Sequence, residues 1–168
     1  MARLFLAIWP DAAAGAALER LARELTVVCE GKPVEGSKIH LTLSFLGEVA
    51  AEREPAIADV AASMPRAGGF TLVLDRAGSF RRSRVAWAGA SREPPALLEL
   101  QSGLEARLRA AGFVLEDRPY RPHLTLARKI ARPLPDARIE PIEVACQAFA
   151  LVVSAGGKYA TRESWPLG

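Results

Sequence analysis

The sequence predicts an α+β fold in which helices are interleaved with antiparallel hairpins, and three observations favour this class. Residues 38–45 and 122–127 alternate between polar and apolar side chains, which is typical of half-buried strands. Stretches with apolar residues at helical spacing separate these segments from other strand-like segments. Gly156-Gly157 lies between two further strand-like segments and is a hairpin signal. These features favour α+β over a doubly wound parallel sheet.

The first half of the chain is predicted to run strand, helix, strand, helix and then two strands. The four strands are expected at 3–9, 38–45, 70–75 and 84–90. Asp11 is the expected N-cap of the first helix, because an Asp side chain can accept hydrogen bonds from the free N–H groups of the first turn. The apolar face of this helix is predicted to carry Leu18, Leu21, Leu25 and Val28. The second helix is predicted over 52–64.

The second half is predicted to repeat this order of elements. Pro94-Pro95 opens a helix that Gly112 ends. Its predicted buried face consists of Leu97, Gln101, Leu104, Leu108 and Ala111. Strands are expected at 122–127, 144–153 and 158–165, with a Pro-rich loop over 132–141.

Composition indicates a folded globular protein. Of the 168 residues 50% are hydrophobic and 24% charged, and the net charge of +3 permits an anionic ligand without requiring one. The only cysteines, Cys29 and Cys146, and the two histidines have no metal-ligand spacing, so no metal and no cofactor are expected. No apolar run approaches the roughly 18 residues of a membrane helix and no signal-peptide cleavage pattern occurs, which favours a cytoplasmic protein without a membrane partner.

Both histidines of the chain are followed by the same three residues. His40-Leu41-Thr42-Leu43 and His123-Leu124-Thr125-Leu126 are separated by 83 residues, almost half of the chain. Because threonine occurs only five times in the sequence, an internal repeat explains this coincidence better than chance.

Strand geometry assigns faces to the side chains of each repeat. Residues i and i+2 of a strand point to the same face, so His40 and Thr42 share a face with Lys38 and Ser44. Leu41, Leu43 and Phe45 are predicted on the opposite face, toward the core. In the second copy, His123 and Thr125 share a face with Arg121. If a pseudo-twofold axis relates the two copies, two imidazoles and two hydroxyls converge in one cleft.

This set of groups suits phosphodiester hydrolysis without a metal. One imidazole can deprotonate the nucleophile while the other protonates the leaving oxygen, because histidine titrates close to neutrality. The two threonine hydroxyls can donate hydrogen bonds to the non-bridging oxygens of the phosphate.

The double motif resembles the hallmark of the two-histidine (2H) phosphoesterase superfamily. Its flanks are similar to the bacterial and archaeal RNA 2′,3′-cyclic phosphodiesterases, also called 2′-5′ RNA ligases; the similar segments are 3–10, 40–48, 83–87, 118–128 and 157–167. The resemblance implies two pseudo-symmetric lobes, each an antiparallel sheet with outer helices, and an active-site cleft between them. It implies one bilobal domain over 1–168, with one motif per lobe at 40–43 and 123–126.

The resemblance also implies an activity and a set of site residues. The expected reaction opens a 2′,3′-cyclic phosphate at an RNA 3′ end to leave a 2′-phosphate, with 2′-5′ ligation of tRNA halves as a second activity. His40 resembles the proton donor to the departing 3′ oxygen, and His123 resembles the base that accepts a proton from water. Thr42 and Thr125 match phosphate-binding hydroxyls. Phe45 and Arg128 match positions near the nucleotide, and they reach it only if their strands end, bend or bulge. Arg84 resembles a family position and is expected to contact the RNA backbone.

Further substrate contacts are expected beside the second motif, and two other functions stay open. Tyr120 fits base stacking and a packing role equally well, and Arg121 lies on the predicted cleft face. Arg81 and Arg82 fit an RNA contact and a solvated turn equally well. The alternatives are a phosphodiesterase of small cyclic nucleotides and a catalytically silent RNA-binding module. Retention of both histidines and both threonines argues against the silent module. A monomer is expected, with RNA ending in a 2′,3′-cyclic phosphate as its partner.

Overall fold

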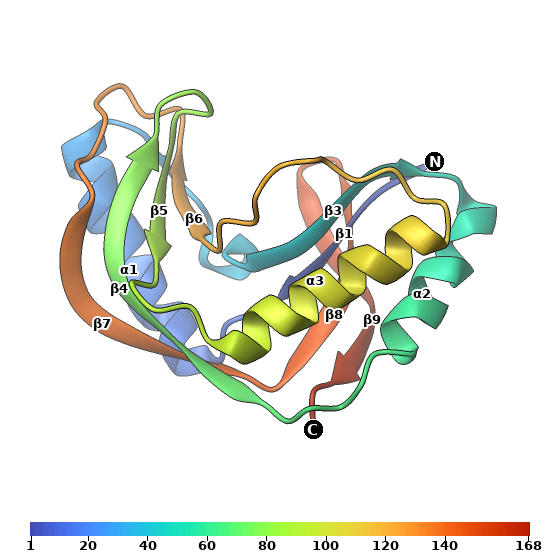
Figure 1. Cartoon of the computed structure of the whole chain (residues 1–168). Coiled ribbons are helices and arrows are strands. Elements are labelled where there is room, and N and C mark those ends of the chain that lie inside the picture. Colours follow the sequence, from blue (N-terminus) through green and yellow to red (C-terminus); the bar gives the residue numbers. More distant parts are fainter.

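A computed structural model describes residues 1–168 and confirms the α+β prediction, with one antiparallel sheet and three α-helices (Figure 1). The order in the sheet is β7-β4-β5-β6-β3-β1-β8-β9, with the short β2 paired to β6. The strands are β1 (Ala2–Ile8), β2 (Lys32–Pro33), β3 (Leu41–Val49), β4 (Phe70–Phe80), β5 (Val85–Gly89), β6 (Leu124–Arg128), β7 (Ala137–Cys146), β8 (Ala148–Ala155) and β9 (Lys158–Pro166). The α-helices are α1 (Ala12–Cys29), α2 (Glu54–Ala62) and α3 (Pro95–Ala110).

The sheet divides into two halves of four strands that meet at the two motifs. One half contains β6, β5, β4 and β7, and the other contains β3, β1, β8 and β9. The halves join where β3 and β6 pair in antiparallel fashion, with Leu41 opposite Leu124. These leucines occupy the same place in the two motifs, so the pseudo-twofold axis passes between them. The halves correspond to the two lobes that the resemblance implies.

Two of the three helices, α1 and α3, cross between the halves. α1 follows β1 in the chain but packs against β6 and β7 of the other half, whereas α2 contacts β9 and α3 contacts β3 (Figure 1). The main core lies between the helices and the sheet and includes Leu18 of α1, Ile57 of α2 and Leu104 of α3, all fully buried. None of the three helices has the length and hydropathy that a membrane-spanning segment needs.

The helix starts and stops follow the predictions, whereas Val28 of α1 and Ala111 after α3 were predicted on buried faces and are exposed. Oδ1 of Asp11 accepts a hydrogen bond of 2.9 Å from the Ala14 amide, which confirms the predicted N-cap. Gly112, with φ of +86°, follows the end of α3 as predicted. Val28 was predicted on the buried face of α1 and is instead 60% exposed. The buried side of α1 consists of Ala14, Leu18, Ala22 and Cys29.

The prediction was wrong over 137–141, where the expected Pro-rich loop contains the first half of β7. The strand expected at 144–153 is confirmed except at Gln147, where the chain passes from the end of β7 into β8. β7 contains Pro141, which has no N–H for a ladder hydrogen bond, and an edge strand tolerates this. The predicted hairpin at Gly156-Gly157 is confirmed, because both residues have positive φ and join β8 to β9.

Candidate active site

Each histidine lies immediately before a motif strand, and each of these strands carries a β-bulge at the same place. Thr42 and Ser44 of β3 pair with the neighbouring residues Ala7 and Leu6 of β1, so Leu43 is the extra residue. In the same way, Thr125 and Ala127 of β6 pair with the neighbouring residues Trp87 and Ala86 of β5, so Leu126 is the extra residue. The repeat therefore includes the backbone irregularity as well as the four motif residues.

The bulges change which residues face the cleft. Past each bulge the alternation restarts, so Phe45 and Arg128 return to the side of the threonines. Phe45 is 42% exposed, and the prediction that it faces the core is wrong. Ser44, predicted to share the His40 face, is 3% exposed. The bulges therefore turn Phe45 and Arg128 toward the motif side chains, which a regular strand would not do.

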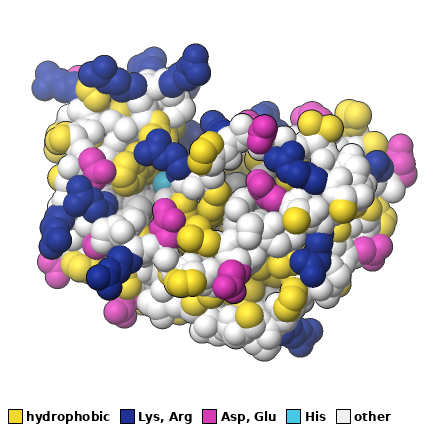
Figure 2. Space-filling model, in the orientation of Figure 1, with side chains coloured by type: hydrophobic (Ala, Val, Ile, Leu, Met, Phe, Trp, Pro, Cys, Tyr) yellow, Lys and Arg dark blue, Asp and Glu magenta, His cyan; other side chains and the backbone are white.

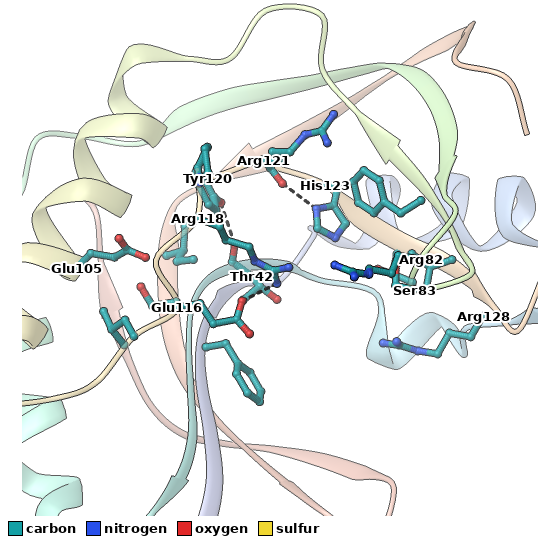
Figure 3. Close-up of a pocket in the computed structure, with 18 residues that line it drawn as sticks. Thr42, Arg82, Ser83, Glu105, Glu116, Arg118, Tyr120, Arg121, His123 and Arg128 are labelled. Atoms are coloured by element: carbon teal, nitrogen blue, oxygen red, sulfur yellow. Dashed lines mark hydrogen bonds and ion pairs between the residues drawn. The ribbon is translucent and has the colours of Figure 1, made fainter. Parts of the chain in front are cut away.

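The four motif side chains line one cleft with two adjoining chambers. The larger chamber has a volume of about 530 Å³ and the smaller about 360 Å³. Both chambers are lined by Thr42, Phe45, His123, Thr125 and Arg128. The smaller chamber continues to His40, with Lys38 and Tyr159 beside it. In the larger chamber, Arg82 and Arg128 reach inward opposite Glu105 and Glu116 (Figure 3).

Both imidazoles are held by the same backbone contact. Nδ1 of His40 lies 2.7 Å from the carbonyl oxygen of Lys38, and Nδ1 of His123 lies 2.7 Å from that of Arg121. A carbonyl oxygen only accepts, so Nδ1 donates in both rings and the proton-exchanging atom is Nε2. Nε2 of His40 lies 3.1 Å from Oγ1 of Thr42. The arrangement therefore provides two oriented imidazoles, each able to accept or donate a proton at Nε2.

The surroundings of the two imidazoles differ. His40 is packed by Phe5, Trp9 and Tyr159, with ring centroids 4.8, 5.6 and 5.5 Å from its own. His123 has one aromatic neighbour of this kind, Phe80, whose ring stands edge-on at 5.0 Å. The aromatic neighbours of His40 come from the opposite ends of the chain, so no local sequence pattern marked them as site residues.

Burial and nearby cations lower both histidine pKa values below the ordinary 6.5. Burial is the main cause in each case, and the hydrogen bond to a backbone carbonyl opposes it. Arg128 and His123 lower the pKa of His40 further. Arg118, Arg121 and Arg128 do the same for His123. Nearby charges therefore act on both rings, with three arginines lowering the pKa of His123 and Arg128 with His123 lowering that of His40.

The other predicted residues are placed in different ways. Tyr120 lines the larger chamber, and its hydroxyl donates a hydrogen bond of 2.8 Å to the Thr42 carbonyl. Arg121 also lines this chamber, with its guanidinium 5.3 Å from the Phe80 ring centroid. Arg84 is exposed and does not line either chamber; its Nε donates to the Ile130 carbonyl at 3.1 Å. No group of three or more His, Cys, Asp or Glu side chains is placed to hold a metal ion.

Comparison with known sequences finds one family and several relatives. The family model of the 2′-5′ RNA ligase superfamily matches residues 9–158. An RNA 2′,3′-cyclic phosphodiesterase of Escherichia coli is 45% identical over 98 residues, which are 58% of this chain and only 55% of that protein. A protein of the same name from Thermus thermophilus is 32% identical over 169 residues, covering 90% of this chain and 81% of that protein.

Solved structures agree with this comparison over the whole fold. Apo LigT of E. coli superposes with a TM-score of 0.86 at 35% identity, covering 98% of this chain and 96% of that chain. LigT complexed with 3′-AMP superposes with a TM-score of 0.83 at 34% identity, covering 98% and 97%. TT0787 of T. thermophilus gives a TM-score of 0.82 at 30% identity, covering 98% and 97%.

Proposed function

Because the chain belongs to the 2′-5′ RNA ligase superfamily, we propose that it hydrolyses RNA 2′,3′-cyclic phosphate ends to 2′-phosphates. One observation carries the proposal: both imidazoles donate Nδ1–H to a backbone carbonyl at the same distance, which leaves both Nε2 atoms for proton transfer. The name of the relatives and the 3′-AMP complex of LigT support an RNA-end substrate.

The surroundings of the two rings support distinct roles. Three arginines lower the pKa of His123, against one arginine and one histidine for His40, so His123 suits the base. Phe5 lies close to His40 with its ring tilted by 30°, and an aromatic face favours a cation, so His40 suits the acid. Water gives its proton to Nε2 of His123 and its oxygen bonds to phosphorus. The bond from phosphorus to O3′ breaks, and O3′ takes the proton from Nε2 of His40.

The remaining cleft residues are proposed to bind the substrate. Thr42 and Thr125 donate hydrogen bonds to the non-bridging oxygens, and Arg128, which lines both chambers, neutralises their charge. Phe45 offers an exposed ring for base stacking. Arg121 contacts the nucleotide, and Tyr120 forms the chamber wall. Each step has a side chain of this chain to perform it, so we propose that turnover needs no metal.

Three further properties follow as part of the proposal. If an RNA 5′-hydroxyl replaces water, the same attack forms a 2′-5′ bond, so tRNA halves are candidate ligation substrates. All proposed groups come from one chain, which is consistent with a functional monomer. Residues 1–168 act as one bilobal domain, since each half of the sheet supplies one histidine.

The test is product analysis on two substrates in excess EDTA. Adenosine 2′,3′-cyclic phosphate and an RNA ending in a 2′,3′-cyclic phosphate are incubated with the protein, and the products are separated by chromatography. We expect a 2′-phosphate from both. A 3′-phosphate as main product would contradict the histidine roles, and activity restored only by Mg²⁺ or Mn²⁺ would contradict metal independence. Hydrolysis of the mononucleotide alone would favour a phosphodiesterase of small cyclic nucleotides, and hydrolysis of neither would favour the silent binding module.

A further inference from the structure

Five exposed cations gather at one end of the β4–β5 half of the molecule. Two neighbouring segments carry them, the turn between β4 and β5 and the loop after β6. We call this surface the basic crest; it consists of Arg81, Arg82, Arg84, Lys129 and Arg132. Dark blue side chains cover this end of the molecule, at the upper left of Figure 2.

Hydrogen bonds hold the two segments of the crest together. The Ile130 amide donates to the Arg84 carbonyl at 3.1 Å, and Nε of Arg84 donates to the Ile130 carbonyl at 3.1 Å. The Ala131 and Arg132 amides both donate to the Cys29 carbonyl at the end of α1. These hydrogen bonds therefore hold the two backbone segments that carry the cations next to each other.

The crest concentrates charge that the rest of the chain balances. Within it only Arg132 has an ion pair, with Glu30 at 3.4 Å, whereas Arg81, Arg82 and Lys129 have none. The whole chain carries only +3. A local excess of like charges on a fixed backbone attracts a polyanion from solution.

Backbone strain is confined to the same place. The chain has three non-glycine residues with positive φ: Glu30 (51°), Arg84 (54°) and Lys129 (53°). Glycine would adopt this conformation without a steric penalty. Strain of this kind persists where surrounding structure enforces it and is typical of ligand-binding segments. Here it accompanies two cations of the crest.

The crest is continuous with the cleft. Arg82 belongs to the crest and also lines the larger chamber, and Arg128, which lines both chambers, directly precedes Lys129 (Figure 3). We propose that the crest binds the sugar–phosphate backbone of the RNA strand that leads to the cyclic phosphate, an inference that rests on the proposed function. Contacts between cations and phosphates position a strand without reading bases, so binding is independent of sequence.

The test compares two double variants with the same change in charge. Arg81→Gln/Lys129→Gln removes two unpaired cations of the crest, and Arg20→Gln/Arg66→Gln removes two exposed cations elsewhere. Hydrolysis is measured on adenosine 2′,3′-cyclic phosphate and on a 20-nucleotide RNA with a cyclic phosphate end. We expect the crest variant to lose about tenfold in kcat/KM on the RNA at low salt and to stay within about twofold on the mononucleotide. The control variant should match the wild type on both.

Fluorescence anisotropy of the same RNA over a salt series tests binding without catalysis. Each lost phosphate contact on a single strand lowers the slope of log Kd against log salt by about 0.7, so the crest variant should lose about 1.4. Equal slopes for the wild type and the crest variant, or equal losses in the two variants, would overturn the proposal. Failure of the wild type to hydrolyse either substrate would contradict the proposed function, while the anisotropy series would still decide whether the crest binds RNA.

Discussion

Each imidazole in the cleft has one nitrogen fixed by the backbone and one left for chemistry. The fixed nitrogen is Nδ1 in both rings. Removal of either ring therefore removes one proton-transfer group, and removal of His40 also removes a packing partner of Phe5, Trp9 and Tyr159. General acid–base groups contribute about 10²–10⁴ in rate, so His40→Ala and His123→Ala should each lower kcat by that factor. The double variant should lose less than the product of the two factors, because both groups act on one transition state. Steady-state kinetics measure the three kcat values, and circular dichroism checks that each variant is folded. A double variant whose loss equals the product of the two single losses would show that the histidines act independently.

The pH profile follows from the lowered pKa values of both histidines. Burial favours the neutral imidazoles, so the free protein carries both uncharged above about pH 7. The proposed mechanism requires one of them to be protonated. We expect kcat/KM to rise as pH falls from about 8, to peak below about 6.5, and to fall when the second ring is protonated. A bound phosphate favours the charged ring, so the alkaline limb of kcat should lie at higher pH than that of kcat/KM. If the alkaline limbs of kcat and kcat/KM coincided above about pH 7.5, this prediction would be contradicted.

Tyr120 links the two motifs through its hydroxyl. It donates to the Thr42 carbonyl, next to the bulge residue Leu43, and it lies three residues before His123. A neutral hydrogen bond contributes about 1 kcal/mol, so Tyr120→Phe should lower kcat about fivefold. If the tyrosine acts by positioning the Thr42 side chain, the loss should disappear in a Thr42→Ala background.

The matched control removes another hydroxyl that donates to a backbone carbonyl. Thr26 donates to the Ala22 carbonyl on α1 and does not line the cleft. Thr26→Val should change the unfolding midpoint and leave kcat unchanged. An equal kcat loss for Tyr120→Phe with and without Thr42→Ala would show that the tyrosine does not act through Thr42.

Among the elements, turns and helix ends were predictable from local chemistry. Gly156-Gly157, the Asp11 cap and Gly112 depend on one or two residues and their own backbone angles, so the sequence carries the whole signal. β7 was not predictable, because the tolerance for Pro141 depends on its place at the sheet edge. The bulges at Leu43 and Leu126 depend on pairing with β1 and β5, which alternation alone does not reveal. The convergence of the four motif residues was predictable, because the repeat is visible in the sequence. The aromatic surroundings of His40 were not predictable, because they come from distant segments of the chain.

Two glycines test the turn and the helix with the same substitution. A Cβ meets no atom within 4 Å at either Gly157 or Gly15, so only backbone conformation decides the effect. Gly157 has φ of +74°, and Gly157→Ala should cost about 1–2 kcal/mol. Gly15 lies inside α1, and Gly15→Ala should stabilise by about 0.5–1 kcal/mol. Urea denaturation measures both; a stabilising Gly157→Ala would contradict the assigned turn.

At the scale of the whole molecule, the crossing of the helices couples the two halves of the sheet. α1 is covalently attached to one half and packs on the other, and α3 joins β5 to β6 yet contacts β3. Each half therefore packs against a helix whose preceding strand belongs to the other half, while α2 stays with the half that contains β3 and β9. We therefore expect one cooperative unfolding transition for the chain.

Single-tryptophan variants report on each half. Trp9→Phe/Trp165→Phe keeps Trp87 on β5, and Trp9→Phe/Trp87→Phe keeps Trp165 on β9. In each variant the midpoint from tryptophan fluorescence in urea should coincide with the midpoint from far-UV circular dichroism. A fluorescence midpoint that differs from that of circular dichroism would indicate that the halves unfold separately, against a single domain.

The repeated bulge gives each motif a third cleft residue, five positions after the histidine, and the two copies differ there. It is an aromatic ring in one copy, Phe45, and a cation in the other, Arg128. A cleft with identical halves would bind the substrate equally well in two orientations related by the pseudo-twofold axis, and its histidines would exchange roles from one turnover to the next. In the proposed function, the apolar ring of Phe45 on one side and the positive charge of Arg128 on the other distinguish the base of the terminal nucleotide from its phosphate. Together with the different aromatic neighbours of the two histidines, this one position gives a direction to a site built from two copies of one motif.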